Sequence, residues 1–469
     1  MPGSATAARR MTGSLSAIMT AMFIVYLDHT VMNVMLPRLI KEFHSTYNTV
    51  HWTVTGYVLA QAAVIPLAGW LSDRYGAKRI FLLAIGWFAA GSLLCAVASG
   101  IEQLILFRIV QGLGGGMIAP IGFAYIYRLS PPGQVGRLMA KVSIPILLAP
   151  ALGPAFSGYL ADSVGWQWIF LMNIPVCIFG LYTGIHHLPR IKSQAAAELD
   201  LAGFLLAPLT FVSLSYGISA SEGSSWGAIG GLATGGMALF LLVVTQLRRS
   251  NPLLELRVYR SGHFAQGSLV LGIAQFAFFG TLYLIPQFLQ VVNDFGAFEA
   301  GSFMIPYAVA LGIVMQFSGR LFDNFGVRWL AVAGTSCLAF AMFVLYRIEP
   351  DTGNGMLLLA IVLLGASAGL CMMPLQTYLM KAAPKSLVGR VTSLTGSIQQ
   401  VMVSFAVSGM TTVLTSRLDI YAKSASLPDA WLQAFRDAFT VILVVAVIGA
   451  CAGLFIRNAG TDDKPMADA

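Results

Sequence analysis

The chain has 469 residues, of which 57% are hydrophobic and only 10% are charged. A soluble domain carries about 25% charged residues, so the composition excludes an ordinary soluble protein and indicates a membrane protein. The net charge of +8 does not indicate nucleic-acid binding, because the basic residues gather in the segments expected on one side of a membrane.

Continuous apolar runs divide the chain, and each is long enough to cross roughly 30 Å of hydrocarbon as a helix. Their apolar residues do not alternate with polar ones, so helices are expected rather than a closed barrel. The first run follows Arg9 and Arg10, but it is longer than the apolar part of a signal peptide and lacks an evident small-residue cleavage site. We therefore expect an uncleaved first span. The fourteen predicted spans are 13–36, 51–72, 80–99, 103–127, 138–160, 167–187, 201–218, 228–247, 266–290, 300–319, 328–346, 356–379, 391–414 and 437–457.

The loop charges predict the orientation of these spans. With the N-terminus inside, 21 of the 28 Lys and Arg residues fall in inside segments, six fall in outside loops, and Arg108 lies in a span. Cytoplasmic loops carry such an excess of Lys and Arg. We therefore expect a multi-pass protein of the cell (inner or plasma) membrane with both termini in the cytoplasm.

Two charged residues lie well inside predicted spans, Asp28 in the first and Arg108 in the fourth. A charge at the centre of a spanning helix costs roughly 2.5–3.5 kcal/mol on insertion scales, so each needs a reason. From the predicted outer ends, Asp28 is roughly 13 Å deep and Arg108 roughly 8 Å, which allows contact in the outer half of the membrane. A carboxylate beside a fixed cation can carry a proton when it is alternately wet and dry. The alternative is a purely structural ion pair.

Two polar neighbours belong to the same region. Gln111 follows Arg108 by three residues and so shares its helical face. His29 adjoins Asp28 but points about 100° away, which favours a packing role over proton transfer.

The chain also repeats itself. Gly69-Trp-Leu-Ser-Asp-Arg-Tyr-Gly-Ala-Lys78 recurs 250 residues later as Gly319-Arg-Leu-Phe-Asp-Asn-Phe-Gly-Val-Arg328, and Pro131-x3-Val-Gly-Arg137 recurs 253 residues later as Pro384-x3-Val-Gly-Arg390. Two anchors at nearly one offset predict two six-helix bundles of the same orientation, with a substrate site between them near the midplane. The predicted units are a bundle over 1–190, two linking spans with cytoplasmic loops over 191–260, and a second bundle with a short cytoplasmic tail over 261–469.

The two copies of the first repeated loop form a candidate gate latch at the cytoplasmic ends of the helices. Alternatively, the charges of this loop only determine the orientation of the helices in the membrane. The predicted latch residues are Gly69, Asp73, Arg74, Gly76, Lys78, Arg79, Asp323 and Arg328. The fifth span contains Pro150, Gly153, Pro154 and Gly158, which predict a kinked, closely packed helix. A role for this helix in preventing leak is left open.

Polar residues in the spans either line a cavity or bond between helices. The candidates for a substrate cavity are Asn33, Tyr57, Gln61, Gln111, Gln275, Gln287, Gln316 and Gln376. All five cysteines lie in apolar runs and are expected to be packing residues. The sequence has no metal-ligand cluster, catalytic triad or phosphate loop, so we expect neither an enzyme nor a bound cofactor, with a proton gradient as the energy source.

These residues resemble motifs of the major facilitator superfamily, and more narrowly of the 14-span drug:proton antiporters of the EmrB/QacA group. Leu27-Asp-His-Thr-Val-Met-Asn-Val-Met-Leu-Pro37 is similar to the first-helix motif, and Gly69-x-Leu-Ser-Asp-Arg-x-Gly-x-Lys-Arg79 to the loop motif of the superfamily. Arg108-Ile-Val-Gln-Gly-x-Gly114 resembles the fourth-helix motif, Gly153-Pro-Ala-Phe-Ser-Gly158 the fifth-helix antiporter motif, and Trp166-Gln-Trp-Ile-Phe-Leu-Met-Asn-Ile-Pro175 a further motif of the group.

The resemblance implies that Asp28 and Arg108 couple transport to protons and that the fifth helix disfavours uniport. Ser157 and Ala149 stand where glycine is usual in the fifth helix, which weakens the second implication. Members that export dications often carry further acids in later helices. Apart from Asp437 at the first position of the last span, the predicted spans after Asp28 contain none, so neutral or monocationic substrates are expected.

The sequence thus predicts a proton-coupled antiporter that exports lipophilic small molecules by alternating access between two bundles. An exporter of a single metabolite, lipid precursor or siderophore is the alternative on the same fold. A membrane receptor or assembly factor without transport is a third, disfavoured by the two intramembrane charges. The expected partners are the substrate, protons and the lipid bilayer, with a periplasmic adaptor protein in addition if the cell has an outer membrane.

Overall fold

The computed structural model describes residues 3–129, 163–190, 200–219, 225–249, 252–349, 354–382, 388–424 and 426–456, together with eight single positions between 138 and 160. The regular structure of these residues is helical, and it includes thirteen helices long and apolar enough to cross a membrane. The expected fold class, an all-helical multi-pass membrane protein, is confirmed. The remaining predicted span, 138–160, falls largely outside the described residues.

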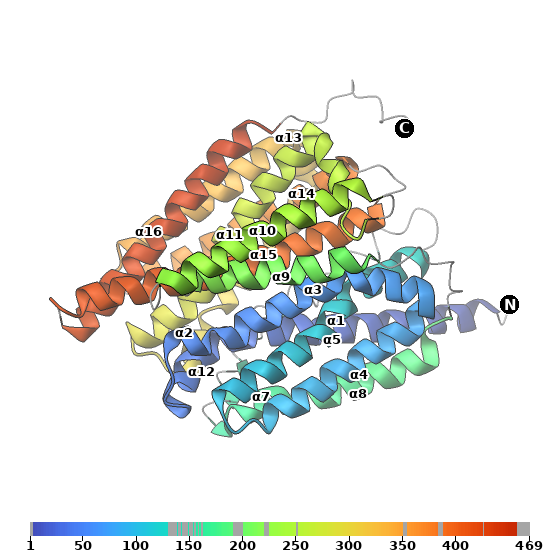
Figure 1. Ribbon diagram of the computed structural model, residues 1–469, viewed down its shortest axis with the longest axis horizontal. Helices are drawn as coiled ribbons and strands as arrows, with labels where there is room; N and C mark the ends of the chain where they lie inside the picture. Colours follow the sequence, from blue (N-terminus) through green and yellow to red (C-terminus); the bar gives the residue numbers. More distant parts are fainter. Residues whose placement is uncertain are drawn as a thin grey trace.

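The N-terminal helices pack against one another in the lower part of Figure 1. Contacts join α1 to α8, α3 to α5, and α4 to both α5 and α8. The bounds are α1 Gly3–Glu42, α2 Tyr47–Val50, α3 Trp52–Tyr75, α4 Ala77–Ala96, α5 Ile101–Leu129, α7 Gln167–Leu171 and α8 Asn173–His187.

Apart from the short α12 at the lower left, the C-terminal helices repeat this arrangement mainly in the upper part of Figure 1. Here α13 packs against α14 and α16, and α11 packs against α14, α15 and α16. The bounds are η2 Leu256–Arg260, α11 Gly262–Val291, α12 Ala297–Ser302, α13 Ile305–Tyr346, α14 Asn354–Ala382, α15 Val388–Tyr421 and α16 Leu427–Leu454.

Several predicted helix ends are wrong, each for a physical reason. The helix of the first span continues through Pro37 to Glu42, because a proline inside a helix removes one hydrogen bond without ending it. The last helix begins at Leu427 rather than at residue 437, since Ser426 caps it by accepting from the backbone N–H of Asp429. Residues 300–319 and 328–346 form two membrane-crossing segments, as predicted, which meet at the kink at Gly326 within α13.

Corresponding glycines mark the joints of the two repeats. Gly76 separates α3 from α4 with φ of 94°, and Gly326 forms the kink of α13 with φ of 75°. A side chain would be strained at either angle, whereas glycine adopts positive φ without penalty. The repeat read from the sequence is therefore a repeat of backbone geometry.

Two further helices, α9 (Leu201–Ser219) and α10 (Ser225–Arg248), form an antiparallel pair that crosses the middle of Figure 1. Close packing of this pair depends on Gly217 and Gly231, where an added Cβ would lie 2.7 Å from the facing backbone. The pair contacts both halves of the molecule, through α3 and α15.

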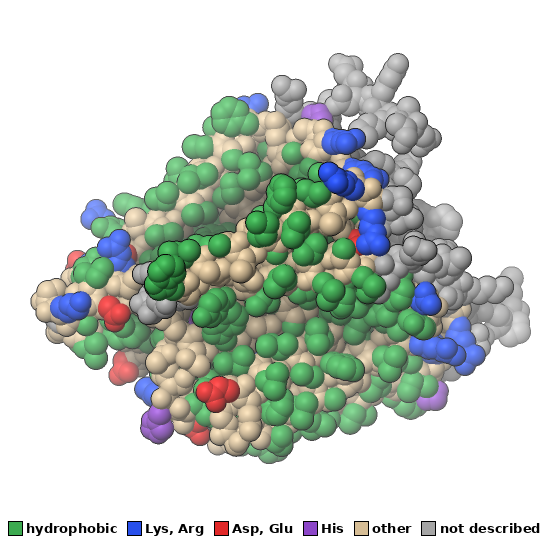
Figure 2. All heavy atoms as spheres, viewed as in Figure 1, with side chains coloured by type: hydrophobic (Ala, Val, Ile, Leu, Met, Phe, Trp, Pro, Cys, Tyr) green, Lys and Arg blue, Asp and Glu red, His purple; other side chains and the backbone are tan. Residues whose placement is uncertain are grey.

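The surface separates charge from apolar area (Figure 2). Lys and Arg side chains gather at the right-hand end of this face, basic, acidic and His side chains are mixed at the left-hand end, and hydrophobic side chains cover most of the surface between them. The chain is therefore a multi-pass membrane protein, whose long helices expose apolar side chains such as Leu83, Leu205 and Phe240.

Candidate functional site

Asp28 of α1 and Arg108 of α5 are in direct contact inside the N-terminal bundle. Arg108 Nη1 lies 2.5 Å from Asp28 Oδ2, and each residue is only 1% exposed. Asp200 and Glu255 are the other buried acids in the described ranges, and both lie outside the candidate spans. Within the membrane-spanning helices that the structure describes, Asp28 is therefore the single buried acid.

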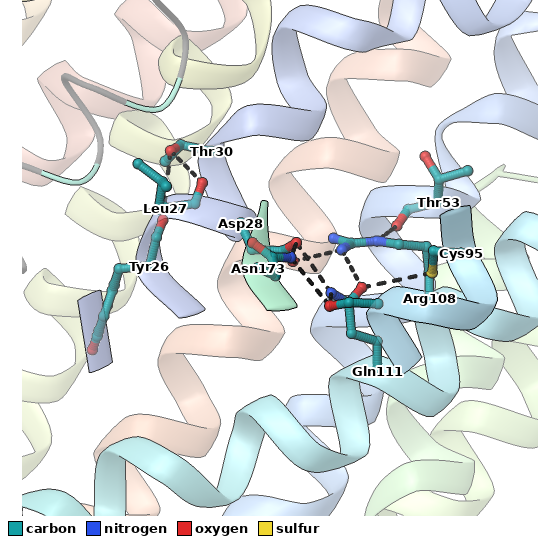
Figure 3. Close-up of polar contacts among 10 residues, drawn as sticks. Tyr26, Leu27, Asp28, Thr30, Thr53, Cys95, Arg108, Gln111 and Asn173 are labelled. Carbon is teal, nitrogen blue, oxygen red and sulfur yellow. Dashed lines mark hydrogen bonds and ion pairs between the residues drawn. The ribbon is translucent and has the colours of Figure 1, made fainter. Parts of the chain in front are cut away.

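The carboxylate of Asp28 accepts hydrogen bonds from three side chains (Figure 3). Arg108 donates to Oδ2, while Gln111 Nε2 and Asn173 Nδ2 donate to Oδ1 at 3.1 and 2.9 Å. Three N–H donors therefore converge on the two oxygens of one carboxyl group, whose ionised form is a pure acceptor.

Arg108 is itself fixed by several groups. Its Nε donates to the backbone oxygen of Thr53 at 3.1 Å, and Nη1 also donates to Gln111 Oε1 at 2.6 Å. Its guanidinium carbon lies 3.9 Å from the ring centroid of Tyr57, within the range of a cation–π contact. The cation therefore has little freedom to follow a moving partner.

Small residues bring the helices of this network together. A Cβ on Gly91 of α4 would lie 2.5 Å from Gln111 Cα, and one on Gly112 of α5 would lie 2.6 Å from the backbone oxygen of Tyr57. The resulting close approach places Ser92 of α4 beside Gln111, whose Nε2 donates to Ser92 Oγ at 2.7 Å.

Ser92 and Asn173 belong to this network but were not predicted as site residues. Ser92 and Asn173 are fully buried, and Asn173 Nδ2 donates to Ser92 Oγ at 3.1 Å as well as to Asp28. Asn173 belongs to a motif that the sequence analysis recognised, but no role was assigned to it. Neutral polar residues carry no insertion cost large enough to single them out.

The predicted cavity residues have different surroundings. Tyr57 and Gln111 belong to the Asp28 network, and Gln61 accepts a hydrogen bond from Gln400 of α15 at 2.8 Å. Asn33, Gln275 and Gln287 are buried, each with a side-chain oxygen for which the described part of the chain supplies no donor. Gln316 is exposed on α13, and Gln376 is half-buried in α14. Their assignment to one cavity stays a prediction.

The predicted latch residues show local contacts. Lys78 Nζ donates to the backbone oxygens of Ile185 and Leu188, both at 2.7 Å, and so caps the C-terminal end of α8. The guanidinium of Arg74 lies over the ring of Trp70, and that of Arg328 over Trp329.

The other latch positions give less support for a latch. A Cβ at Gly69 would meet nothing within 4 Å, and Arg79 is exposed. The side chains of Asp73 and Asp323 lie outside the described residues, so their pairing across the bundle stays a prediction.

Of the predicted fifth-helix residues, only Gly153 is described. A Cβ there would collide with Thr30 Oγ1 on α1, so glycine is required for this approach. Pro150, Pro154 and Gly158 lie outside the described residues.

Comparison with known proteins identifies the family. Residues 18–407 match the model of the Major Facilitator Superfamily. The chain belongs to this superfamily. It is therefore a membrane transporter by family rather than an enzyme, and the resemblance read from its motifs is confirmed.

Relatives and solved structures agree with this assignment. The chain is 33% identical over 407 residues to "Multidrug resistance protein B homolog" of Mycobacterium tuberculosis, covering 84% of this chain and 74% of the relative. It is 29% identical over 454 residues to "Lincomycin resistance protein LmrB" of Listeria monocytogenes, covering 95% and 96%. The fold is similar to that of an auto-inhibited POT family peptide transporter, with a TM-score of 0.70 at 14% identity over 96% of this chain and 99% of the other.

Proposed function

We propose that this transporter exports lipophilic small molecules in exchange for protons, by alternating access in the cell membrane with both termini in the cytoplasm. The observation that carries the proposal is the buried Asp28–Arg108 pair. Asp28 can change charge where a membrane protein otherwise avoids charge, which is typical of residues on a proton pathway. The names of the relatives support a drug-like substrate.

Proton uptake would change the net charge of this site. With Asp28 ionised, the Asp28–Arg108 pair has no net charge, whereas protonation of Asp28 leaves a net charge of +1 beside Tyr57. A buried positive charge without a counter-ion is costly, so protonation favours a conformation in which the site is wetter. The same positive charge would repel a cationic substrate, which links proton entry to substrate release.

The substrate class follows from the number of acids. Because the described membrane-spanning part buries a single acid, a second positive charge on a substrate would lack a counter-ion. We therefore infer neutral or monocationic lipophilic substrates.

The decisive experiment measures transport and proton release together. In proteoliposomes with an imposed pH gradient, wild type is expected to move lincomycin or a monocationic dye, and addition of substrate to the purified protein is expected to release protons. Asp28→Asn, which keeps the size of the side chain, should fold but lose both signals. Asp437→Asn is the matched control, because Asp437 pairs with Arg417 near the start of α16 and should not be needed for coupling.

Full gradient-driven transport by Asp28→Asn would refute the proposal. A panel that pairs each monocation with its dication tests the substrate class, and better transport of the dications would refute that part. Transport of a single metabolite in place of the drug panel would favour the dedicated exporter.

A further inference from the structure

Two side-chain amides bridge the same pair of oxygens in the buried network. Gln111 and Asn173 each donate one nitrogen to both Asp28 Oδ1 and Ser92 Oγ. They approach from different helices, Gln111 from α5 and Asn173 from the first residue of α8 (Figure 3). Both side chains are fully buried.

The oxygens of these two amides differ in what holds them. Gln111 Oε1 accepts from Arg108 Nη1 at 2.6 Å and from Cys95 Sγ at 3.7 Å. Asn173 Oδ1 is buried without a donor in the described part of the chain. A guanidinium is always a donor, so it fixes the orientation of Gln111. The orientation of Asn173 is fixed only by Asp28 and Ser92.

A proton on Asp28 Oδ1 conflicts with this arrangement. The new O–H is a donor, but it would face the N–H groups of Gln111 and Asn173, which are also donors. Gln111 cannot reverse without losing its bond from Arg108. Asn173 can reverse by turning its amide plane, which exchanges a donor for an acceptor at nearly the same place.

We propose that Asn173 is a positioning residue for proton coupling, whose side-chain amide reverses when Asp28 takes up a proton. In the reversed state Asn173 Oδ1 accepts the O–H of Asp28 and, after rotation of its hydroxyl, that of Ser92. The bonds balance, because two N–H donations from Asn173 are replaced by two O–H donations to it. The proton comes from water on one side of the membrane and leaves to water on the other, with no other bond made or broken.

The two amides therefore differ in how they affect proton uptake by Asp28. Gln111 stabilises only the ionised carboxylate, whereas Asn173 stabilises whichever form is present. A hydrogen bond to a charged group contributes enough that removing a fixed donor should move the titration midpoint upward by about one to two pH units. Removing a reversible partner should move it much less.

The inference rests on the proposed function, and its test separates the two. Infrared difference spectra of the purified protein in lipid bilayers, recorded as a function of pH, should show a carboxylic C=O band that is absent in Asp28→Asn. We expect Gln111→Leu to raise the midpoint of that band by about one to two pH units and Asn173→Leu to change it by less than half a unit. Leu is close in size to both residues and can neither donate nor accept.

A second measurement observes the amide directly. In protein labelled with ¹³C,¹⁵N-asparagine, the side-chain signal that is missing from Asn173→Leu should shift with pH at the midpoint of the Asp28 band. The shift should be absent in Asp28→Asn. An Asn173 signal unchanged across the titration, or a midpoint raised by one to two units in Asn173→Leu, would overturn the inference. Absence of any band that depends on Asp28 would instead overturn the proposed function.

Discussion

Besides its bond to Gln111, the guanidinium of Arg108 makes three different contacts. It pairs with Asp28, donates to the backbone oxygen of Thr53, and stacks on Tyr57. A lysine at this position could keep the charge, but its single ammonium could not make the other two contacts at the same time.

We therefore expect Arg108→Lys to retain a folded protein with gradient-driven transport about tenfold slower, which corresponds to roughly 1.4 kcal/mol. Arg108→Ala should be inactive and less stable by about 3–5 kcal/mol, because it leaves Asp28 buried without its counter-ion. Initial transport rates and thermal unfolding of the purified variants check both. Wild-type rates for the lysine variant would show that a point charge is sufficient.

The charged residues of the site and Gln111 could be predicted from sequence, whereas Ser92 and Asn173 could not. Asp28 and Arg108 stand out because few charges occur in the spans, and Gln111 follows from helical spacing. Asn173 lies 145 residues from Asp28 along the chain and donates to it directly, whereas Ser92 joins the network through Gln111 and Asn173. The local sequence around Ser92 and Asn173 does not indicate these contacts.

At the scale of elements, the two glycines of the first repeated loop have different requirements. Gly76 has a φ of 94°, whereas Gly69 is helical and has open space around it. Gly76→Ala is therefore expected to lower the free energy of unfolding by about 1–3 kcal/mol through backbone strain. Gly69→Ala should be nearly neutral. Thermal unfolding in detergent compares the two, and equal stability would contradict the assigned backbone requirement.

The α9–α10 pair is tied to the next segment by one buried acid. Asp200, 3% exposed, accepts from the backbone N–H groups of Gly203 and Leu253 and from the Gln246 amide, and it pairs with Arg249. Burial alone would raise the pKa of Asp200, but these hydrogen bonds and Arg249 outweigh it, so that its pKa is lowered.

A lowered pKa means that the ionised carboxylate stabilises the fold. This stabilisation is present above the unfolded-state pKa of about 3.9 and is lost as the pH falls through the lower folded-state value. Asp200→Asn should lower the free energy of unfolding by about 1–3 kcal/mol at pH 7 and weaken its dependence on pH below about 4. Thermal unfolding between pH 7 and pH 3 tests this. A wild-type acid profile in the variant would show that Asp200 does not carry the effect.

At this scale, the sequence predicts that the spanning helices are present, but it does not predict the residues at which several of them begin or end. The apolar run of α16 identifies the span, yet the first ten residues of the helix contain Asp429 and Arg436 and precede that run. A hydropathy pattern reports the length that lipid covers and not the length of the helix. The cap at Ser426, followed by proline, is the signal that would have located the start.

At the scale of the whole molecule, two side-chain amides of the C-terminal half bond to the N-terminal half. Gln400 Nε2 of α15 donates to Gln61 Oε1 of α3 at 2.8 Å, and Gln290 Nε2 of α11 donates to the backbone oxygen of Val34 on α1 at 3.0 Å. Such contacts favour the conformation in which they form.

We expect Gln400→Leu to shift the population away from this conformation by about two- to tenfold, because a neutral hydrogen bond contributes about 0.5–1.5 kcal/mol net. Pulsed electron paramagnetic resonance between spin labels on α3 and α15 measures the distance distribution. Gln399→Leu, at the neighbouring position, is the matched control. An unchanged distribution in Gln400→Leu would show that the Gln61–Gln400 bond does not distinguish the states.

The α9–α10 pair also constrains how the chain could have acquired its length. The joints at Gly76 and Gly326 are equivalent only if both repeats enter the membrane from the same side. An insertion between the repeats preserves that condition when it crosses the membrane an even number of times, whereas a single added crossing would turn the second repeat upside down. A helical hairpin is thus the smallest membrane-spanning insertion compatible with the duplication, and its removal would leave a twelve-helix protein of unchanged topology.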